Sequence, residues 1–247
     1  MAGMGLMKKI RKMTGKKGIK KNIGQGLVDH IDKLAKMIAK GNRNEEETRR
    51  WVIDVLVDAF GYHPDQLETE MKALGKRVDI AITSKGKVLM VIECKASNVE
   101  LKQAAVNQAA NYATSLGAEW AAVTNGRAWK LYHVNPKSGA EADLVEILDV
   151  GLLDDDGISK DDIDALFMMT EQSLVSGDTM KEFHFNNCTS EERIINALIS
   201  TPLLKALHDE IVNSYRLEFG VDVMGVQDGF LQHMVAYLLD VELTDDV

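Results

Sequence analysis

Two early stretches of the chain repeat apolar side chains every three or four residues, as one face of a helix does. Over residues 27–40 the stripe comprises Val28, Ile31, Leu34, Ala35 and Ile38, and the Gly41-Asn42 pair ends it. A second stripe, over residues 44–61, begins at Asn44, which with Glu47 three positions later comes close to a capping box. The spacing therefore predicts two successive helices.

The apolar pattern then takes the two-residue period of strands. Residues 77–83 alternate, with Val78, Ile80 and Ile82 on one face, whereas residues 87–95 are apolar almost throughout, as in a strand covered on both faces. Asn125-Gly126 separates two later apolar runs and is a strong hairpin signal. The other predicted strands cover residues 67–71, 119–124, 127–134 and 143–148, and a helix is predicted at 99–116.

Helical spacing returns over residues 159–170, 189–207 and 230–239, and the composition changes near residues 176–179. We therefore predict an α/β domain at residues 26–175 and a helical C-terminal region at residues 180–247. Residues 1–25 are rich in glycine and lysine with little apolar periodicity, so a disordered arm is expected there.

Charge is distributed unevenly along the 247 residues. The first 28 residues carry eight Lys or Arg and no acid, and the whole chain has a net charge of −9, so the remainder carries −17. Such a body binds nucleic acid poorly except through the arm or a local groove. The arm is interpreted equally well as an interaction tail or as a solubilising extension.

Other broad features point to a soluble protein that keeps its thiols reduced. No apolar run reaches the ~18 residues of a membrane helix, and no apolar segment follows the basic N-terminus as in a secretory signal. Two cysteines, Cys94 and Cys188, do not form a disulfide framework. We predict a cytoplasmic protein with no membrane partner.

Three polar residues interrupt the apolar strands and suggest a chemical site. Glu93 and Lys95 are two apart, so they share a strand face, and Asp79 lies on the preceding strand, joined by a short turn. Two carboxylates and a backbone carbonyl, with Cys94 as the natural donor, are ligands suited to Mg²⁺. Lys95 would then hold a water molecule or stabilise developing negative charge.

The following helix adds Gln108 and Tyr112, which are four apart and therefore lie on one face near the strand ends. Glu47, on the earlier helix, can reach the same place as an outer metal ligand. Simpler interpretations stay open from the residues alone. Asp79 is explained as a solvent-facing strand residue, Glu47 as a capping acid, and the Glu93–Lys95 or Asp79–Lys95 pair as a plain ion pair.

The ordered series of these residues resembles a known family. Asp79 followed by Glu93-Cys94-Lys95 is similar to the PD-(D/E)xK nuclease core, and Gln108-Ala109-Ala110-Asn111-Tyr112 is similar to the Q-x-x-x-Y motif of RecB-type nucleases. Residues 44–170 also resemble the N-terminal nuclease domain of type I restriction enzyme R subunits. The further stretches that carry this resemblance are Glu46-Glu47-Thr48-Arg49, Val91–Ala96 and Val123–Trp129 with Leu131-Tyr132.

This resemblance implies a restriction-endonuclease-like fold, with a mixed central sheet flanked by helices, and phosphodiester cleavage of DNA that depends on Mg²⁺ or Mn²⁺. It implies metal ligation by Asp79 and Glu93 with Glu47, activation of water by Lys95, and organisation of the site by Gln108 and Tyr112. The sequence contains no G-x-x-x-x-G-K-[ST] loop, so we expect no motor within it.

Two functions therefore remain as hypotheses. The first is a Mg²⁺-dependent deoxyribonuclease that serves restriction or defence against foreign DNA. The second is a non-cleaving module that retains the nuclease fold and binds nucleic acid or protein. Residues 180–247 are expected to support docking of a partner protein or self-association, although ordinary helical packing explains them equally well.

Overall fold

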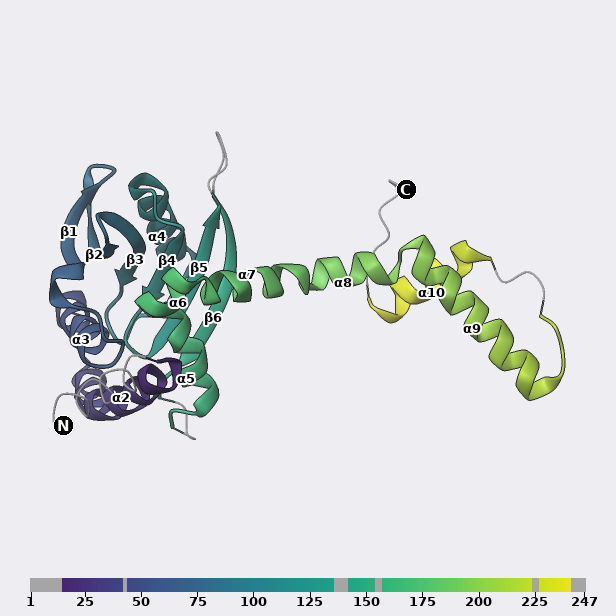
Figure 1. The fold of residues 1–247 in the computed structure, drawn as a ribbon, viewed down its shortest axis with the longest axis horizontal. Coiled ribbons are helices and arrows are strands. Elements are labelled where there is room, and N and C mark those ends of the chain that lie inside the picture. The colour runs from purple at the N-terminus through teal and green to yellow at the C-terminus, as the bar shows by residue number, and fades with distance from the viewer. Residues whose placement is uncertain (1–14, 42–43, 136–141, 154–156, 224–226, 241–247) are drawn as a thin grey trace, which may run out of the picture. The chain divides into compact units, whose positions relative to one another are not determined.

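The computed structural model describes residues 15–41, 44–135, 142–153, 157–223 and 227–240. The chain divides into two compact units, Met1–His184 and Phe185–Val247. The boundary falls inside a helix, α7 (Asp178–Cys188), which begins within the interval between the predicted domain and the predicted C-terminal region. Figure 1 labels the elements in chain order.

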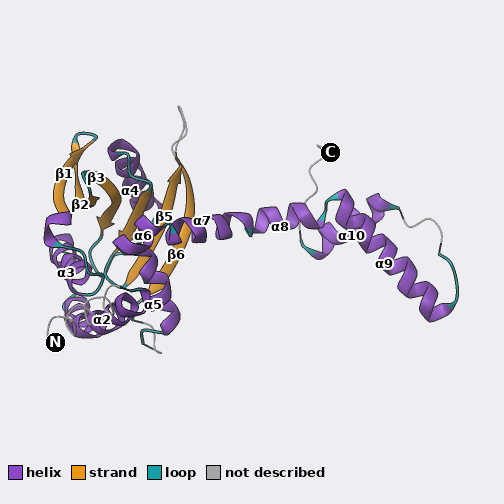
Figure 2. Cartoon of the chain, viewed as in Figure 1, coloured by secondary structure: helices purple, strands orange, loops and turns teal. Residues whose placement is uncertain are grey.

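The first unit is built on a mixed sheet of six strands in the order β1-β2-β3-β4-β5-β6 (Figure 2). The strands are β1 (Leu67–Ala73), β2 (Lys76–Ser84), β3 (Lys87–Cys94), β4 (Trp120–Thr124), β5 (Ala128–Asn135) and β6 (Asp143–Gly151). Neighbours pair antiparallel except β3 and β4, which are parallel. The crossover between these two contains helix α4 (Gln103–Leu116), as a parallel connection requires. The predicted α/β class with a mixed sheet is confirmed.

Helices cover both faces of this sheet and create two separate cores. The first core cluster joins Leu34, Trp51, Ile80, Met90 and Leu131, and the second joins Val91, Ala109, Tyr112 and Val123. Helix α4 supplies the second cluster. The first is supplied by α2 (Lys16–Ala39), α3 (Glu45–Asp58), α5 (Lys160–Leu166) and the segments η2 (Phe167–Met169), α6 (Glu171–Ser176) and α7. A short η1 (Pro64–Gln66) leads into β1.

The N-terminal helix is longer than its sequence pattern predicted. Helix α2 begins at Lys16, whereas the predicted helix began at residue 27. Ile23 and Leu27 are fully buried, so the apolar face extends backward and packs in the first core cluster. The expectation of disorder is therefore wrong for residues 16–25, and its remainder, residues 1–14, lies outside the described residues.

Strand β2 does not keep one alternation along its whole length. Ile80 and Ile82 pack in the first core cluster, but Val78, predicted on the same face, packs in the second. The β1–β2 ladder pairs Thr69 with Ile80 and Met71 with Val78, and it is interrupted at the Glu70–Asp79 position between them. Glu70 has a left-handed backbone with φ 61°. This local distortion is the reason that the predicted single face of β2 is wrong at Val78.

The second unit contains helices α8 (Glu191–Leu198), α9 (Thr201–Phe219) and α10 (Asp228–Leu238). Its described residues bury few apolar side chains: Leu204, Leu231 and Ala236. Within the described ranges, no helix has the length and apolar character needed to cross a membrane.

Candidate active site

Two carboxylates meet where strands β2 and β3 separate. The last ladder pair of these strands is Ile80 with Ile92, and Asp79 and Glu93 are the next residues in register. The Cys94 amide donates to Asp79 Oδ2 at 2.8 Å, so this side chain takes the place of a ladder bond. The polar break predicted from the strand pattern thus brings Asp79 and Glu93 together at the point where the two strands separate.

Burial sets the electrostatics of this pair. Desolvation raises the pKa of Glu93 to about 7, because its side chain is 4% exposed, and the nearby charge of Asp79 adds to the increase. Desolvation also raises the pKa of Asp79, although the Cys94 amide and the charges of Lys95 and Arg49 oppose the rise. The site therefore holds more negative charge than its surroundings readily stabilise.

Lys95 partly balances this charge. Its Nζ donates to Glu93 Oε1 at 2.6 Å, and its side chain is 19% exposed, so Lys95 is only partly shielded from solvent. Burial lowers the pKa of Lys95, but the bond to Glu93 and the charges of Glu93, Glu45 and Asp79 outweigh it and raise the pKa overall. The ion pair considered from sequence alone is thus formed, through one oxygen of Glu93.

The first turns of helix α3 supply site neighbours that the sequence analysis missed. Glu45 Oε1 lies 4.0 Å from Lys95 Nζ, and Arg49 Nη1 lies 3.7 Å from Asp79 Oδ1. Arg49 also pairs with Glu46 and lies 3.7 Å from Glu70. Glu45 and Arg49 are four apart and share a helix face. The only signal available in the sequence was the Glu46–Arg49 stretch that carries the family resemblance.

The third predicted metal ligand, Glu47, is partly buried on the same helix, next to the buried Thr48. Among the residues that the structure describes, no three or more His, Cys, Asp and Glu side chains are grouped so that they could hold a metal ion. Glu47 is therefore not assembled with Asp79 and Glu93 into a ready three-ligand group, and its role stays a prediction.

Gln108 and Tyr112 form a pair on helix α4. The Gln108 amide Nε2 donates to the Tyr112 hydroxyl at 3.3 Å, as the four-residue spacing predicted. Tyr112 is 3% exposed and belongs to the second core cluster with Val91 and Val123. Because Val91 precedes Glu93 on the same strand face, the pair lies on the side of the sheet that carries the carboxylates.

The residues present fit a divalent cation. Glu93 Oε2 is buried and has no hydrogen-bond partner among the residues that the structure describes, although Oε1 of the same carboxylate is paired with Lys95. An unpartnered buried carboxylate oxygen is costly, and here it lies beside a second carboxylate. Asp79 and Glu93 would hold a hard cation with oxygen ligands, such as Mg²⁺, in this arrangement.

A cavity elsewhere contains none of these residues. It has a volume of about 640 Å³ and is lined by Phe60, Ser84 and Thr170 among others. Ser84 ends strand β2, five residues beyond Asp79, so the cavity lies toward the other end of that strand. Its size alone does not connect it with the carboxylates.

Comparison with known proteins identifies the part of the chain that contains the site. Residues 44–147 match the family described as type I restriction enzyme R protein N terminus. No curated protein and no solved structure matches the chain. The predicted resemblance to the R-subunit N-terminal domain is thus confirmed for a segment that includes every candidate site residue, from Glu45 to Tyr112. At the level of the family, the match supports a restriction-related nuclease.

Proposed function

Because residues 44–147 resemble the type I restriction enzyme R protein N terminus, we propose that this protein is a metal-dependent deoxyribonuclease that acts in restriction or defence against foreign DNA. The observation that carries the proposal is the Asp79–Glu93–Lys95 cluster, with its unpartnered Glu93 oxygen. A metal-dependent phosphodiester hydrolase uses such a group to place a metal, a water molecule and a cation around one phosphate.

Each side chain has a defined part in this proposal. Asp79 and Glu93 would hold Mg²⁺, or Mn²⁺ in its place, and Glu47 is proposed as an outer ligand. A bound divalent cation polarises a phosphate and lowers the pKa of bound water. Lys95 directs its ammonium group at the attacking water and the developing negative charge. Gln108 and Tyr112 organise the substrate side of the site.

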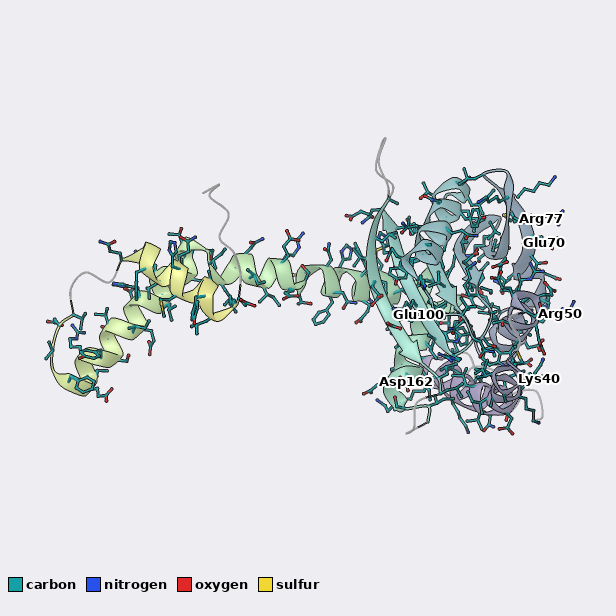
Figure 3. The ribbon with its side chains drawn as sticks, turned by 180° about the vertical axis from the view of Figure 1, so that it is seen from behind. Lys40, Arg50, Glu70, Arg77, Glu100 and Asp162 are labelled. Atoms are coloured by element: carbon teal, nitrogen blue, oxygen red, sulfur yellow. The ribbon has the colours of Figure 1, made fainter. Side chains whose placement is uncertain are left out.

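Exposed arginines near the site are suited to the DNA backbone. Figure 3 shows Arg77 and Glu70 close together, with Arg50 farther along the same side of the domain. The side chains of Arg50 and Arg77 are 74% and 63% exposed, although each is paired with a glutamate. Such residues contribute to binding phosphates and would make DNA affinity fall as salt increases.

A cleavage assay tests the proposal directly. Supercoiled, linear and single-stranded DNA are each incubated with the full chain in Mg²⁺, in Mn²⁺ and in EDTA. Cutting that requires a metal supports the proposal and identifies the substrate form. Cutting that persists in EDTA contradicts metal dependence. Absence of cutting in every condition favours the non-cleaving module, or a nuclease that requires a partner.

Metal binding should also stabilise the native protein without any DNA. At a concentration 100 times the dissociation constant, Mg²⁺ or Mn²⁺ adds about 2.7 kcal/mol to the free energy of unfolding, because it binds the folded site preferentially. Thermal unfolding with and without metal measures this effect. Asp79→Asn should abolish the metal-dependent shift, whereas Asp149→Asn, which removes an acid paired with Lys130 on another part of the sheet, should retain it.

The outcome separates the two hypotheses of function. A shift that Asp79→Asn removes supports the nuclease site. If neither cation shifts the unfolding temperature of the unsubstituted protein, the carboxylates do not form a metal site, and the non-cleaving module is favoured.

The second unit supports an additional role in association. Helix α9 exposes apolar side chains at every fourth position: Leu203, Leu207, Ile211, Tyr215 and Phe219. The described residues of the unit bury few apolar side chains, so this ridge is a suitable surface for another protein. The i±4 ridges of two helices can interdigitate. We propose that it binds a second copy of the chain or a partner subunit.

Ile211→Asp should weaken this association, because it places a charge at the centre of the ridge. Asn213→Asp is the matched control, because it adds the same charge about 200° around the helix. Light scattering after size exclusion measures the molar mass, which is 27.3 kDa for one chain. A concentration-dependent increase that Ile211→Asp alone removes supports self-association. A monomer at all concentrations contradicts it and leaves a partner subunit as the occupant.

A further inference from the structure

The backbone that follows strand β3 is held at alternate residues. The Lys95 amide donates to Thr124 O at 2.8 Å, and the Ser97 amide donates to Thr48 Oγ1 at 3.1 Å. Asn125 Nδ2 donates to Val99 O at 2.8 Å. The regular pairing of β3 with β4 ends at Cys94, so side chains from outside these strands continue to fix the chain just where Lys95 begins.

Thr48 reaches this segment from helix α3. It is 1% exposed and lies between Glu45 and Arg49, the two α3 residues that face the site. Its hydroxyl accepts the Ser97 amide and also lies 3.5 Å from Asn44 O. A buried hydroxyl without a partner is unfavourable, so the bond to Ser97 fixes the distance between the helix and the segment.

Asn125 holds the segment from the opposite side, and it is itself held firmly. Its Oδ1 accepts the amides of Arg127 at 3.0 Å and Ala128 at 2.8 Å, while its amide group donates to Val99. The next residue, Gly126, has φ 83°, and a Cβ there would lie 2.8 Å from Leu34 Cδ1. The turn therefore fits closely against Leu34 of helix α2.

We propose that Thr48 and Asn125 are positioning residues for Lys95. Together they fix the backbone of residues 95–99 between helix α3 and the β4–β5 turn. The position of this backbone sets the direction of the Lys95 side chain, whose Nζ donates to Glu93. The consequence for catalysis rests on the proposed nuclease function, but the positioning itself does not.

A chemical-labelling experiment tests the positioning without using activity. An amine-acetylating reagent modifies the folded full chain, and mass spectrometry compares the rates at Lys95 and Lys130. Lys130 is a matched internal reference, because its side chain is 24% exposed and bonded to Asp149 at 2.6 Å, against 19% and a 2.6 Å bond to Glu93 for Lys95.

Three variants separate the hydrogen bonds from general packing. Thr48→Val keeps the shape but removes the acceptor, Thr48→Ser keeps the acceptor, and Asn125→Asp keeps Oδ1 but cannot donate to Val99. The ratio of labelling at Lys95 to that at Lys130 should rise about tenfold in Thr48→Val and Asn125→Asp, as loss of one buried hydrogen bond permits. It should stay near the unsubstituted value in Thr48→Ser.

Kinetics then tests the catalytic consequence. In Thr48→Val and Asn125→Asp, kcat should fall about 10- to 100-fold, because a misplaced catalytic group loses the favourable geometry. KM and the Mn²⁺ affinity measured by calorimetry should change little, since Asp79 and Glu93 are retained. Thr48→Ser should recover the activity.

The outcomes are distinguishable. Unchanged labelling in both Thr48→Val and Asn125→Asp overturns the positioning role, as does equal labelling in Thr48→Val and Thr48→Ser. If one variant does not fold, the other carries the test. Increased labelling of Lys95 in a protein that cuts no DNA would support the positioning role and favour the non-cleaving module or a nuclease that requires a partner.

Discussion

Lys95→Ala should reduce DNA cleavage by about 10²–10³-fold while leaving the fold intact, as the loss of one preorganised charge at a reacting centre does. Lys95 has the ammonium group nearest to the two carboxylates, and it is partly open to solvent, where a phosphate would enter.

The measurement is the initial rate of metal-dependent cleavage, with circular dichroism to establish that the variant is folded. Lys130→Ala is the control, because it removes a comparably buried, paired lysine from another strand. Equal rates for Lys95→Ala and the unsubstituted protein would eliminate the proposed role of Lys95. A loss in Lys130→Ala as large as in Lys95→Ala would indicate general destabilisation instead.

The metal-free protein should lose stability as pH rises from about 5 to 8. The pKa of Glu93 is about 7 in the folded protein, against an ordinary value of 4.5. Between these values the folded state binds more protons than the unfolded state, so the free energy of unfolding falls with increasing pH. A shift of this size corresponds to about 3 kcal/mol. The raised pKa of Asp79 acts in the same direction.

Chemical denaturation across this pH range measures the effect, and Glu93→Gln is the variant that should flatten it. Glutamine keeps the shape and cannot ionise, so this variant should be more stable than the unsubstituted protein at pH 8 without metal. It should also lose metal-dependent cleavage. Saturating Mg²⁺ should restore the stability that the unsubstituted protein loses at high pH, and it should not stabilise Glu93→Gln. A pH-independent stability, or a rise with pH, would show that Glu93 ionises readily in the native site.

Sequence patterns predicted which residues of the candidate site lie near one another, because these residues are close together in the sequence. Glu93 and Lys95 share a face through the two-residue period, and a short turn returns the chain to Asp79. Gln108 and Tyr112 meet through the four-residue period of one helix, which the hydrogen bond between them bears out. The strands of the six-stranded sheet were predicted from the two-residue period of apolar side chains and from the Asn125-Gly126 turn.

The parts that sequence reasoning missed depend on how separate elements pack. Which residue of helix α3 faces the site depends on the rotation of that helix against the sheet, and periodicity does not specify it. Glu47 was selected on its chemistry and its role stays a prediction, whereas Glu45, which was not selected, is an acid of α3 that lies 4.0 Å from Lys95. Likewise, the burial of Ile23 depends on a core completed by Phe167, a residue far along the chain.

The proposed site residues and the residues of the first core cluster occupy different ranges of the sequence. Every residue with a proposed catalytic part lies within residues 44–147, the segment that matches the family. Helix α2 and the segments after β6 lie outside that segment, yet they bury Leu27, Leu34 and Phe167 completely. A fragment cut to the matching segment would therefore keep its reactive groups and helix α3, but it would expose the part of the first core cluster that helix α2 and the segments after β6 cover. Any transplant of this site into another protein has to carry these covering helices with it.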